Sequence, residues 1–187
     1  MRIVIDLQGA QSSSSRNRGI GRYTNALSLG IAELARSRHE LIVALNGEFD
    51  EAIEEIKQRF AGLVEAGNFR VWNPPAHGQL AGAGGRRANE KLYEGFLSSL
   101  EPDVILIASL FEGLSDAAVT SIGAFARLRT ATVLYDLIPL INAKPYLDNA
   151  AVREWYLRKV TALRRADMWF AISESSRQEG IRYLGLD

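Results

Sequence analysis

Short apolar runs alternate along this chain with longer segments in which apolar residues recur every three or four positions. Runs of four to eight apolar residues are typical of strands, and the longer spacing is typical of one buried helix face. Strands that alternate with helices predict an α/β protein with a mostly parallel sheet. The expected strands lie at residues 2–7, 41–45, 69–72, 103–108, 131–137 and 168–172.

The segments of helical period lie between and after these runs. They predict helices at about residues 21–38, 53–63, 92–100, 116–128, 146–163 and 173–184. The stretch from Asn73 to Arg87 holds two prolines and four glycines and predicts an exposed loop. No repeat and no linker divides residues 1–187, so we expect one doubly wound domain with helices on both faces of the sheet. Ligands of such sheets bind at the carboxyl ends of the strands.

Composition narrows the function classes. The chain has 187 residues, 47% of them apolar, and 22 Lys and Arg balance 22 Asp and Glu. Zero net charge argues against nucleic acid as the main partner. The absence of cysteine excludes disulfides, thiolate metal sites and a cysteine nucleophile. His39 and His77 have no neighbours at ligand spacing, so we expect no metal.

No apolar run is long enough for a signal peptide or a membrane span. We therefore expect a cytoplasmic protein, and peripheral contact with the inner face of a membrane stays open.

Two glycines open the first expected helix. Gly19 and Gly21, with Arg22 beside them, follow the first strand, where helix N-terminal amides favour an anion and glycine lets a phosphate approach the backbone. The spacing matches neither the dinucleotide fingerprint nor the P-loop, because Thr24 stands at the third glycine position. A phosphate site and a flexible turn that caps the helix fit this pattern equally well.

A second candidate lies at the end of a buried strand. Tyr135 and Asp136 precede Leu137-Ile138-Pro139, and the sheet would hold Asp136 at the crevice as a base or as an acceptor for sugar hydroxyls. The alternative is an aspartate that only bonds the local backbone before the proline. Geometry alone leaves these two interpretations equal.

Two further loops end at the same edge of the sheet. Glu112 follows the strand at residues 103–108 and is a substrate-proximal candidate without an evident structural duty. Ser173 follows the last strand, where an N-cap role explains it better than a ligand contact. Trp155 and Tyr156 fit the helical stripe and predict core positions.

Several short motifs occur in order along the chain. They are MRIVIDLQG at Met1 to Gly9, RGIGRY at Arg18 to Tyr23, YDLIP at Tyr135 to Pro139, ISESSR at Ile172 to Arg177, and YLG at Tyr183 to Gly185. Together they resemble the amino-terminal half of family 4 (group 1) glycosyltransferases, and especially the mannosyltransferase-like members of bacterial surface-polysaccharide assembly. The resemblance spans nearly the whole chain.

The resemblance implies a retaining hexosyltransferase of the GT-B fold, of which this chain is the Rossmann-like, acceptor-side half. It implies a nucleotide-diphosphate sugar as donor and a saccharide or lipid-linked acceptor. We expect no cofactor and no metal, because the sequence has no Asp-x-Asp pair and a helix terminus with arginines can take the diphosphate charge. Gly19 and Gly21 would face the donor diphosphate with Arg22 close by. The family's His-Asp pair falls on Tyr135 and Asp136, and tyrosine cannot take over a histidine role.

The resemblance also implies a second, donor-binding domain that carries a Glu-x7-Glu motif, and we expect that this domain is not among these 187 residues. We therefore expect a domain of a larger enzyme that is inactive alone. A second hypothesis is a stand-alone binding subunit that joins a separate catalytic chain through an apolar face of the helix at 173–184. A third, a nicotinamide oxidoreductase, is disfavoured by Thr24 and by the missing acidic residue after Leu45.

Overall fold

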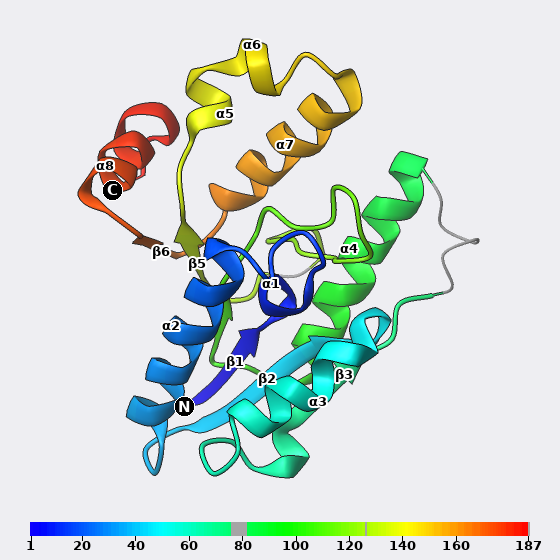
Figure 1. The fold of residues 1–187 in the computed structure, drawn as a ribbon, viewed down its shortest axis with the longest axis vertical. Helices are drawn as coiled ribbons and strands as arrows, with labels where there is room; N and C mark the ends of the chain where they lie inside the picture. Colours follow the sequence, from blue (N-terminus) through cyan, green and yellow to red (C-terminus); the bar gives the residue numbers. More distant parts are fainter. Residues whose placement is uncertain (76–81, 126, 187) are drawn as a thin grey trace.

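Six strands form one parallel sheet in the computed structural model, which describes residues 1–75, 82–125 and 127–186 (Figure 1). Their spatial order is β3-β2-β1-β4-β5-β6, the order of a Rossmann-type doubly wound sheet. This confirms the expected α/β fold, and every described strand pair is parallel. The strands are β1 (Arg2–Asp6), β2 (Glu40–Asn46), β3 (Phe69–Trp72), β4 (Val104–Ile107), β5 (Thr130–Leu134) and β6 (Met168–Ala171).

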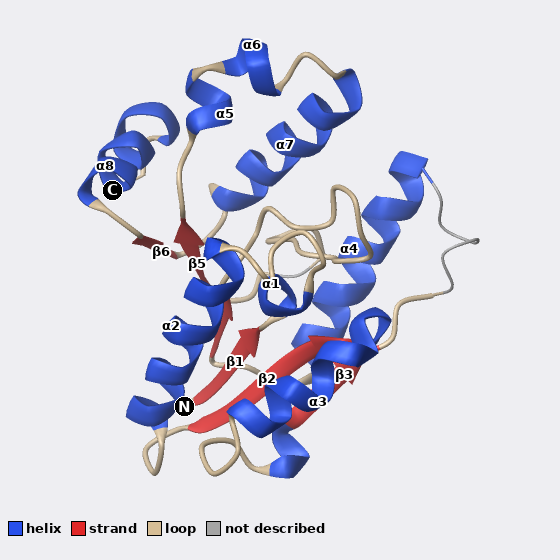
Figure 2. Cartoon of the chain, in the orientation of Figure 1, coloured by secondary structure: helices blue, strands red, loops and turns tan. Residues whose placement is uncertain are grey.

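Helices cover the sheet and connect its strands, except between β4 and β5, where the described residues are irregular (Figure 2). No helix in the described part of the chain is long and apolar enough to cross a membrane. The α-helices are α1 (Gln8–Gln11), α2 (Gly19–Ala35), α3 (Asp50–Arg59), α4 (Gly82–Ser99), α5 (Ile138–Ile141), α6 (Ala143–Tyr146), α7 (Ala150–Leu163) and α8 (Glu174–Glu179). Three single turns complete the set, namely η1 (Gly47–Phe49), η2 (Ala66–Asn68) and the π-helical η3 (Gly180–Leu184).

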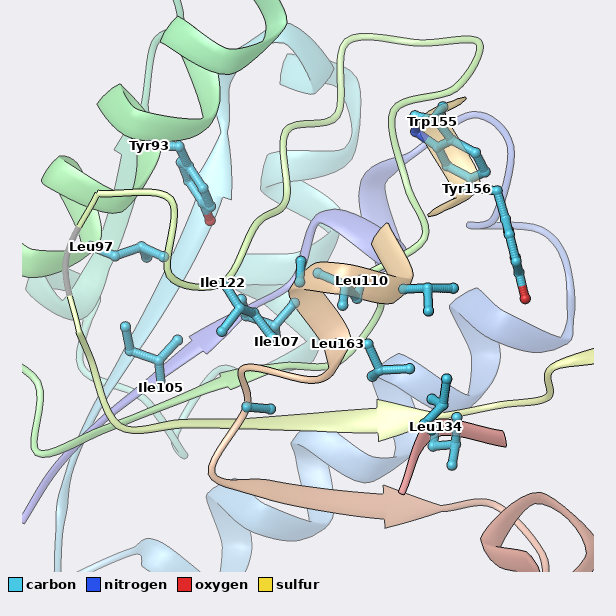
Figure 3. Packing of buried hydrophobic residues seen from close by; sticks show 14 of the residues in the cluster. Tyr93, Leu97, Ile105, Ile107, Leu110, Ile122, Leu134, Trp155, Tyr156 and Leu163 are labelled. Atoms are coloured by element: carbon cyan, nitrogen blue, oxygen red, sulfur yellow. The ribbon is translucent and has the colours of Figure 1, made fainter. Parts of the chain in front are cut away.

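Two apolar clusters fill the two faces of the sheet. Side chains alternate between the faces along a strand, so Val4 joins the cluster under α4 and α7, and Ile5 joins the cluster under α2 and α3. Figure 3 shows the first cluster, in which Leu97 of α4 and Leu163 of α7 pack near Ile107 of β4. Both faces of the central strands are therefore dry, as their continuous apolar runs predicted.

The expected helix at residues 116–128 is wrong: its described residues form an irregular segment instead. Side chains from distant elements bond its backbone groups, since Val119 N donates to Gln8 Oε1 at 2.8 Å and Ala124 N donates to Glu94 Oε1 at 2.8 Å. Gly123 adopts a left-handed φ of 69°, which a helix does not allow. Tertiary hydrogen bonds have replaced the intrahelical ones. We call residues 108–125, between β4 and β5, the β4–β5 segment.

The expected loop at residues 73–87 is partly wrong, because α4 begins at Gly82 and makes residues 82–87 helical. Helix propensity is a weak preference that packing overrides, and Tyr93 and Leu97 anchor this helix in the core at 0% and 1% exposure. Residues 76–81 lie outside the described residues. The short helices α5 and α6 had no periodic signal in the sequence.

The core position of Leu163 generates a stability prediction. Leu163 is 0% exposed at the end of α7, whereas Leu157 on the same helix is 43% exposed. Leu163→Ala leaves a cavity and should lower the free energy of unfolding by about 2–5 kcal/mol. Leu157→Ala should stay within about 0.5 kcal/mol of the parent protein. Urea denaturation followed by circular dichroism measures both, and equal losses would contradict the packing described here.

Candidate functional site

The loops that follow β1 and β4 meet where the strand order reverses, which is where ligands of doubly wound sheets bind. Gly9 in α1 lies directly against Ser109. A Cβ atom at Gly9 would lie 2.4 Å from Ser109 Cβ and 3.2 Å from Thr24 Oγ1, so a larger residue would push these loops apart. Protein atoms therefore fill the space between Gly9, Ser109 and Thr24, which leaves no room for a ligand there.

Three buried amide side chains, Gln8, Gln11 and Asn46, form a network at the ends of β1 and β2. Asn46 Nδ2 donates to Gln8 Oε1 at 2.9 Å, and the backbone N–H and C=O of Asn46 both bond the Gln11 carboxamide. Gln8 also donates to Val119 O at 2.6 Å and accepts from Val119 N. This amide network fastens the β4–β5 segment to the strand ends.

The amide network also bears on the nicotinamide hypothesis. Asn46 ends β2, where a dinucleotide-binding enzyme places the carboxylate that holds the ribose. Its Oδ1 accepts from Glu48 N at 3.0 Å, and its Nδ2 is bonded to Gln8 Oε1 and to Ala117 O. Because Asn46 is fully buried and its polar atoms are all bonded within the protein, this position offers no ribose contact.

Asp6 at the end of β1 is a buried carboxylate. Its Oδ2 accepts from Tyr93 OH at 2.9 Å and from Gln8 Nε2 at 3.2 Å, and its Oδ1 accepts from Gln8 N at 2.7 Å. Burial raises the pKa of Asp6 to about 6, although these hydrogen bonds favour the ionised form. Asp6 therefore joins β1 to α4 and titrates well above an ordinary aspartate.

Glu112 is almost fully buried at 2% exposure in the β4–β5 segment. Ser109 Oγ donates to Glu112 Oε1 at 2.7 Å, and Ser12 and Ser15 from the loop after β1 also face the carboxylate. Burial raises the pKa of Glu112 above its usual value. The structure thus places this predicted residue at the crevice between the loops that follow β1 and β4.

Tyr135 connects three elements at the carboxyl edge of the sheet. Its OH donates to Ala108 O at 3.1 Å and lies 3.4 Å from Thr24 Oγ1 in α2. The Tyr23 ring meets the Tyr135 ring edge-on at 5.7 Å between centroids. Ser176 Oγ of α8 donates to Tyr135 O. Tyr135 is half-buried, and burial raises its pKa to about 12, so its phenol remains a neutral hydrogen-bonding group.

Asp136 is exposed next to Tyr135, and it makes the local turn that the sequence allowed. Its Oδ1 accepts from Ile138 N at 3.1 Å, which forms a turn just ahead of α5. Ser173 has the expected N-cap role, because its Oγ accepts from Ser176 N at 3.1 Å at the start of α8. Each residue follows the carboxyl end of its strand, β5 or β6, and each has a structural role.

The two glycines and Arg22 at the start of α2 have different surroundings in the structure. Gly21 N donates to Ser15 O at 3.1 Å, and a Cβ atom at Gly21 would lie 2.5 Å from that oxygen, so Gly21 allows close packing of the preceding loop. The Cβ position of Gly19 has no atom within 4 Å. Arg22 lies about 200° around the helix from Thr24, the residue that contacts Tyr135, and it lines a groove together with Glu55 of α3. The role of all three in diphosphate binding stays a prediction.

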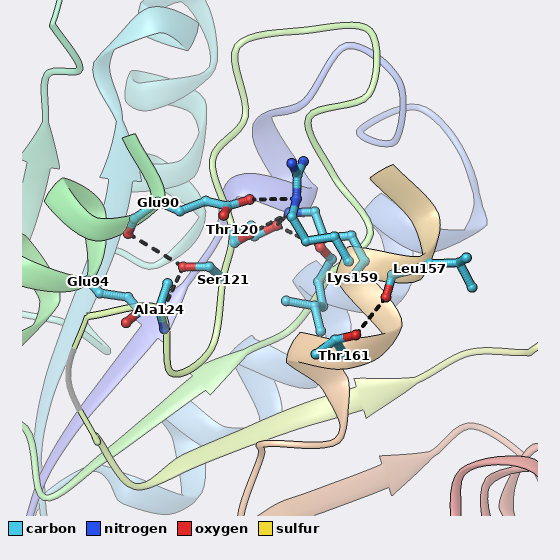
Figure 4. Close-up of polar contacts among 10 residues, drawn as sticks. Glu90, Glu94, Thr120, Ser121, Ala124, Leu157, Lys159 and Thr161 are labelled. Carbon is cyan, nitrogen blue, oxygen red and sulfur yellow. Dashed lines mark hydrogen bonds and ion pairs between the residues drawn. The ribbon is translucent and has the colours of Figure 1, made fainter. Parts of the chain in front are cut away.

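A cleft of about 310 Å³ opens beside Glu112, between α4, α7 and the β4–β5 segment. Its volume is within the range of small-ligand sites. At its base Lys159 of α7 donates to Thr120 Oγ1 at 2.7 Å and to Thr120 O (Figure 4). Burial lowers the pKa of Lys159 to about 8. Glu94 of α4 holds the far end of the segment through Ser121 and Ala124.

Comparison with known proteins supports the resemblance read from the motifs. No family model and no solved structure matches the chain. Over 188 aligned residues, which cover 98% of this chain, it is 36% identical to the serotype-specific mannosyltransferase WbdA of Escherichia coli. The chain is mannosyltransferase-like. A second Escherichia coli protein of the same name is 32% identical over 78% of the chain. The mannosyltransferase-like chain spans about a fifth of the length of these relatives, 22% and 18%.

Sequence reasoning missed several polar residues of the mannosyltransferase-like chain. Lys159 carried a signal, since it occupies the same helical stripe as Tyr156 and Leu163, where a lysine must be buried with a partner. Asp6 and Asn46 each end an apolar strand, which also marks the carboxyl edge. Their distant partners could not be found, because no local pattern connects Asp6 with Tyr93 or Asn46 with Ala117, which are 87 and 71 positions apart.

The raised pKa of Asp6 predicts how stability depends on pH. The folded pKa is about 6, and an unfolded aspartate titrates near 3.9. Stability due to protonated Asp6 is therefore complete below about pH 4 and is lost as the pH rises through 6, by roughly 3 kcal/mol in total. Asp6→Asn should remove that part of the slope between pH 4 and pH 7 in urea denaturation. Parallel profiles of parent and variant would contradict the assignment.

Proposed function

We propose that this chain is the acceptor-side domain of a retaining glycosyltransferase, which moves a hexose from a nucleotide-diphosphate sugar to a saccharide or lipid-linked acceptor. The observation that carries the proposal is the 36% identity to a mannosyltransferase over 98% of the chain. Because that relative is described as serotype-specific, we propose a role in surface-polysaccharide assembly. The reaction would take place in the cytoplasm, at the inner face of the membrane.

The carboxyl edge of the sheet supports this proposal. It gathers an exposed carboxylate at Asp136, a neutral phenol at Tyr135 and the buried carboxylate of Glu112, which are groups that hydrogen-bond sugar hydroxyls. Asp136 would accept a proton from the attacking hydroxyl or hold the transferred sugar. Tyr135 would position the sugar by hydrogen bonding, since its raised pKa makes proton transfer at neutral pH unfavourable.

The donor diphosphate needs positive charge and backbone amides. In the proposed enzyme the start of α2 at Gly19 would face the diphosphate from this side, and a further domain would supply most of the donor contacts. The span of this chain, 22% of the relative's length, is consistent with such a division. We propose that the chain alone transfers no sugar at a measurable rate, because most of the groups that stabilise the departing diphosphate would belong to the further domain.

Asp136→Asn separates the proposed chemical role from the turn. Asparagine keeps an Oδ1 acceptor for Ile138 N, so the start of α5 should remain intact and the melting temperature unchanged. Loss of the carboxylate should lower the transfer rate by about 10²-fold or more. The measurement is sugar transfer from GDP-mannose to an oligomannose acceptor by the enzyme that contains this chain.

Asp148→Asn is the matched control, because Asp148 is an exposed aspartate ahead of α7. Its transfer rate should equal that of the parent enzyme. If Asp136→Asn also transfers mannose at the parent rate, Asp136 forms only a turn and the proposed role is wrong. If the intact parent enzyme transfers no hexose from any nucleotide-diphosphate sugar, the proposed function itself is wrong.

A further inference from the structure

Three residues that border the cleft beside Glu112 each contain a buried polar atom that has no hydrogen-bond partner among the described residues. The atoms are Asn89 Oδ1 of α4, and Trp155 Nε1 and Arg158 Nε of α7. An unpaired buried donor or acceptor costs about 1–3 kcal/mol, so three of them around one cavity require an explanation. We call this cavity the Trp155 cleft; it is bordered by Asn89, Glu112, Asp116, Trp155 and Arg158.

The Trp155 indole is a fixed donor. Its residue is only 9% exposed, and its ring meets the Phe111 ring edge-on at 6.3 Å between centroids. The ring packs in the core, as its helical position predicted (Figure 3). Trp155 also borders the cleft. A buried indole N–H normally finds an acceptor, and none of the described residues supplies one.

The charges around the cleft identify the ligand class. Arg86, Arg158 and Lys159 line it together with three carboxylates, Glu90, Glu112 and Asp116. Arg158 Nε lies 3.4 Å from Glu90 Oε1 as an ion pair without hydrogen-bond geometry. Three cations and three carboxylates leave this lining without net charge, so it does not favour an anion such as phosphate. A hydroxyl group both donates and accepts, so a hydroxyl-rich neutral molecule can satisfy an indole N–H, an amide oxygen and the carboxylates together.

We propose that the Trp155 cleft is a saccharide-binding subsite, in which a sugar hydroxyl accepts from Trp155 Nε1 and another donates to Asn89 Oδ1. This inference rests on the proposed function for its assignment of the sugar to the acceptor. Glu112 connects the cleft to the crevice, because the residue lines the cleft and its carboxylate accepts from Ser109 beside Gly9. The subsite would hold an acceptor residue next to the one that receives the hexose, and would thereby select the acceptor.

Nuclear magnetic resonance of the indole N–H groups tests the subsite on the full chain. The protein has three tryptophans, and Trp169 Nε1 donates to Leu163 O at 2.8 Å, so its signal is an internal reference. Titration with mannobiose should shift the Trp155 indole signal saturably and leave the Trp169 signal in place. Trp155→Phe assigns the signal. Titration with inorganic phosphate should leave both signals in place.

Asn89→Leu removes the acceptor and should weaken mannobiose binding about tenfold. Asn17→Leu is the matched control, because Asn17 is an exposed residue of the loop before α2, and its affinity should equal that of the parent. An unchanged Trp169 indole signal shows that each variant is folded. If Asn89→Leu fails this check, Arg158→Gln replaces it, with the same expected loss.

The outcomes separate the subsite from the proposed function. A mannobiose shift confined to residues around Tyr135 and Asp136, or no shift at all, overturns the subsite. Neither result tests the proposed function, which is tested by the transfer assay. A Trp155 signal that moves with phosphate and not with mannobiose also overturns it, since the ligand would be an anion. A saturable mannobiose shift at Trp155 supports the subsite even if the transfer assay fails.

Discussion

The carboxamide of Gln8 is the contact on which the carboxyl edge of this sheet depends. It donates to Val119 O and Asp6 Oδ2 and accepts from Val119 N and Asn46 Nδ2, so one buried side chain joins β1, β2 and the β4–β5 segment. Each of these groups would cost free energy if it were buried without a partner. The segment therefore stays irregular and in place without helical hydrogen bonds of its own, and it holds Glu112 between the crevice and the Trp155 cleft.

Local patterns were sufficient for the sheet and insufficient for this segment. Continuous apolar runs such as the one that ends at Ile107 identified the inner strands, because a strand buried on both faces must be apolar throughout. The edge strands β3 and β6 were found from short runs although they are largely exposed or half-buried. The sequence at residues 116–128 has helical periodicity, but its described residues form no helix. Instead they hydrogen-bond Gln8, Glu94 and Lys159, which come from three other elements. Contacts between residues so far apart in the sequence leave no local pattern from which they could be predicted.

The candidate site shows the same division. The sequence located Tyr135, Asp136 and Glu112 correctly at strand ends, where the parallel sheet gathers them, and correctly assigned Ser173 to an N-cap. It could not decide between ligand binding and local structure at Gly21 or Asp136. The structure shows a local duty for both, a close contact with Ser15 O and a bond from Ile138 N. Their chemical roles remain proposals, which the charge-neutral replacement of Asp136 separates from the turn.

The central claim is that a mannosyltransferase-like chain holds its acceptor along one edge, from Trp155 past Glu112 to Asp136. A crystal structure of the protein grown with an oligomannose tests it most directly, because the density locates each sugar ring. The account predicts one ring within hydrogen-bond distance of Trp155 Nε1 and Asn89 Oδ1, with the chain of sugars continuing toward Tyr135. A sugar bound at another face of the sheet, with no density at the carboxyl edge at saturating concentration, would contradict it.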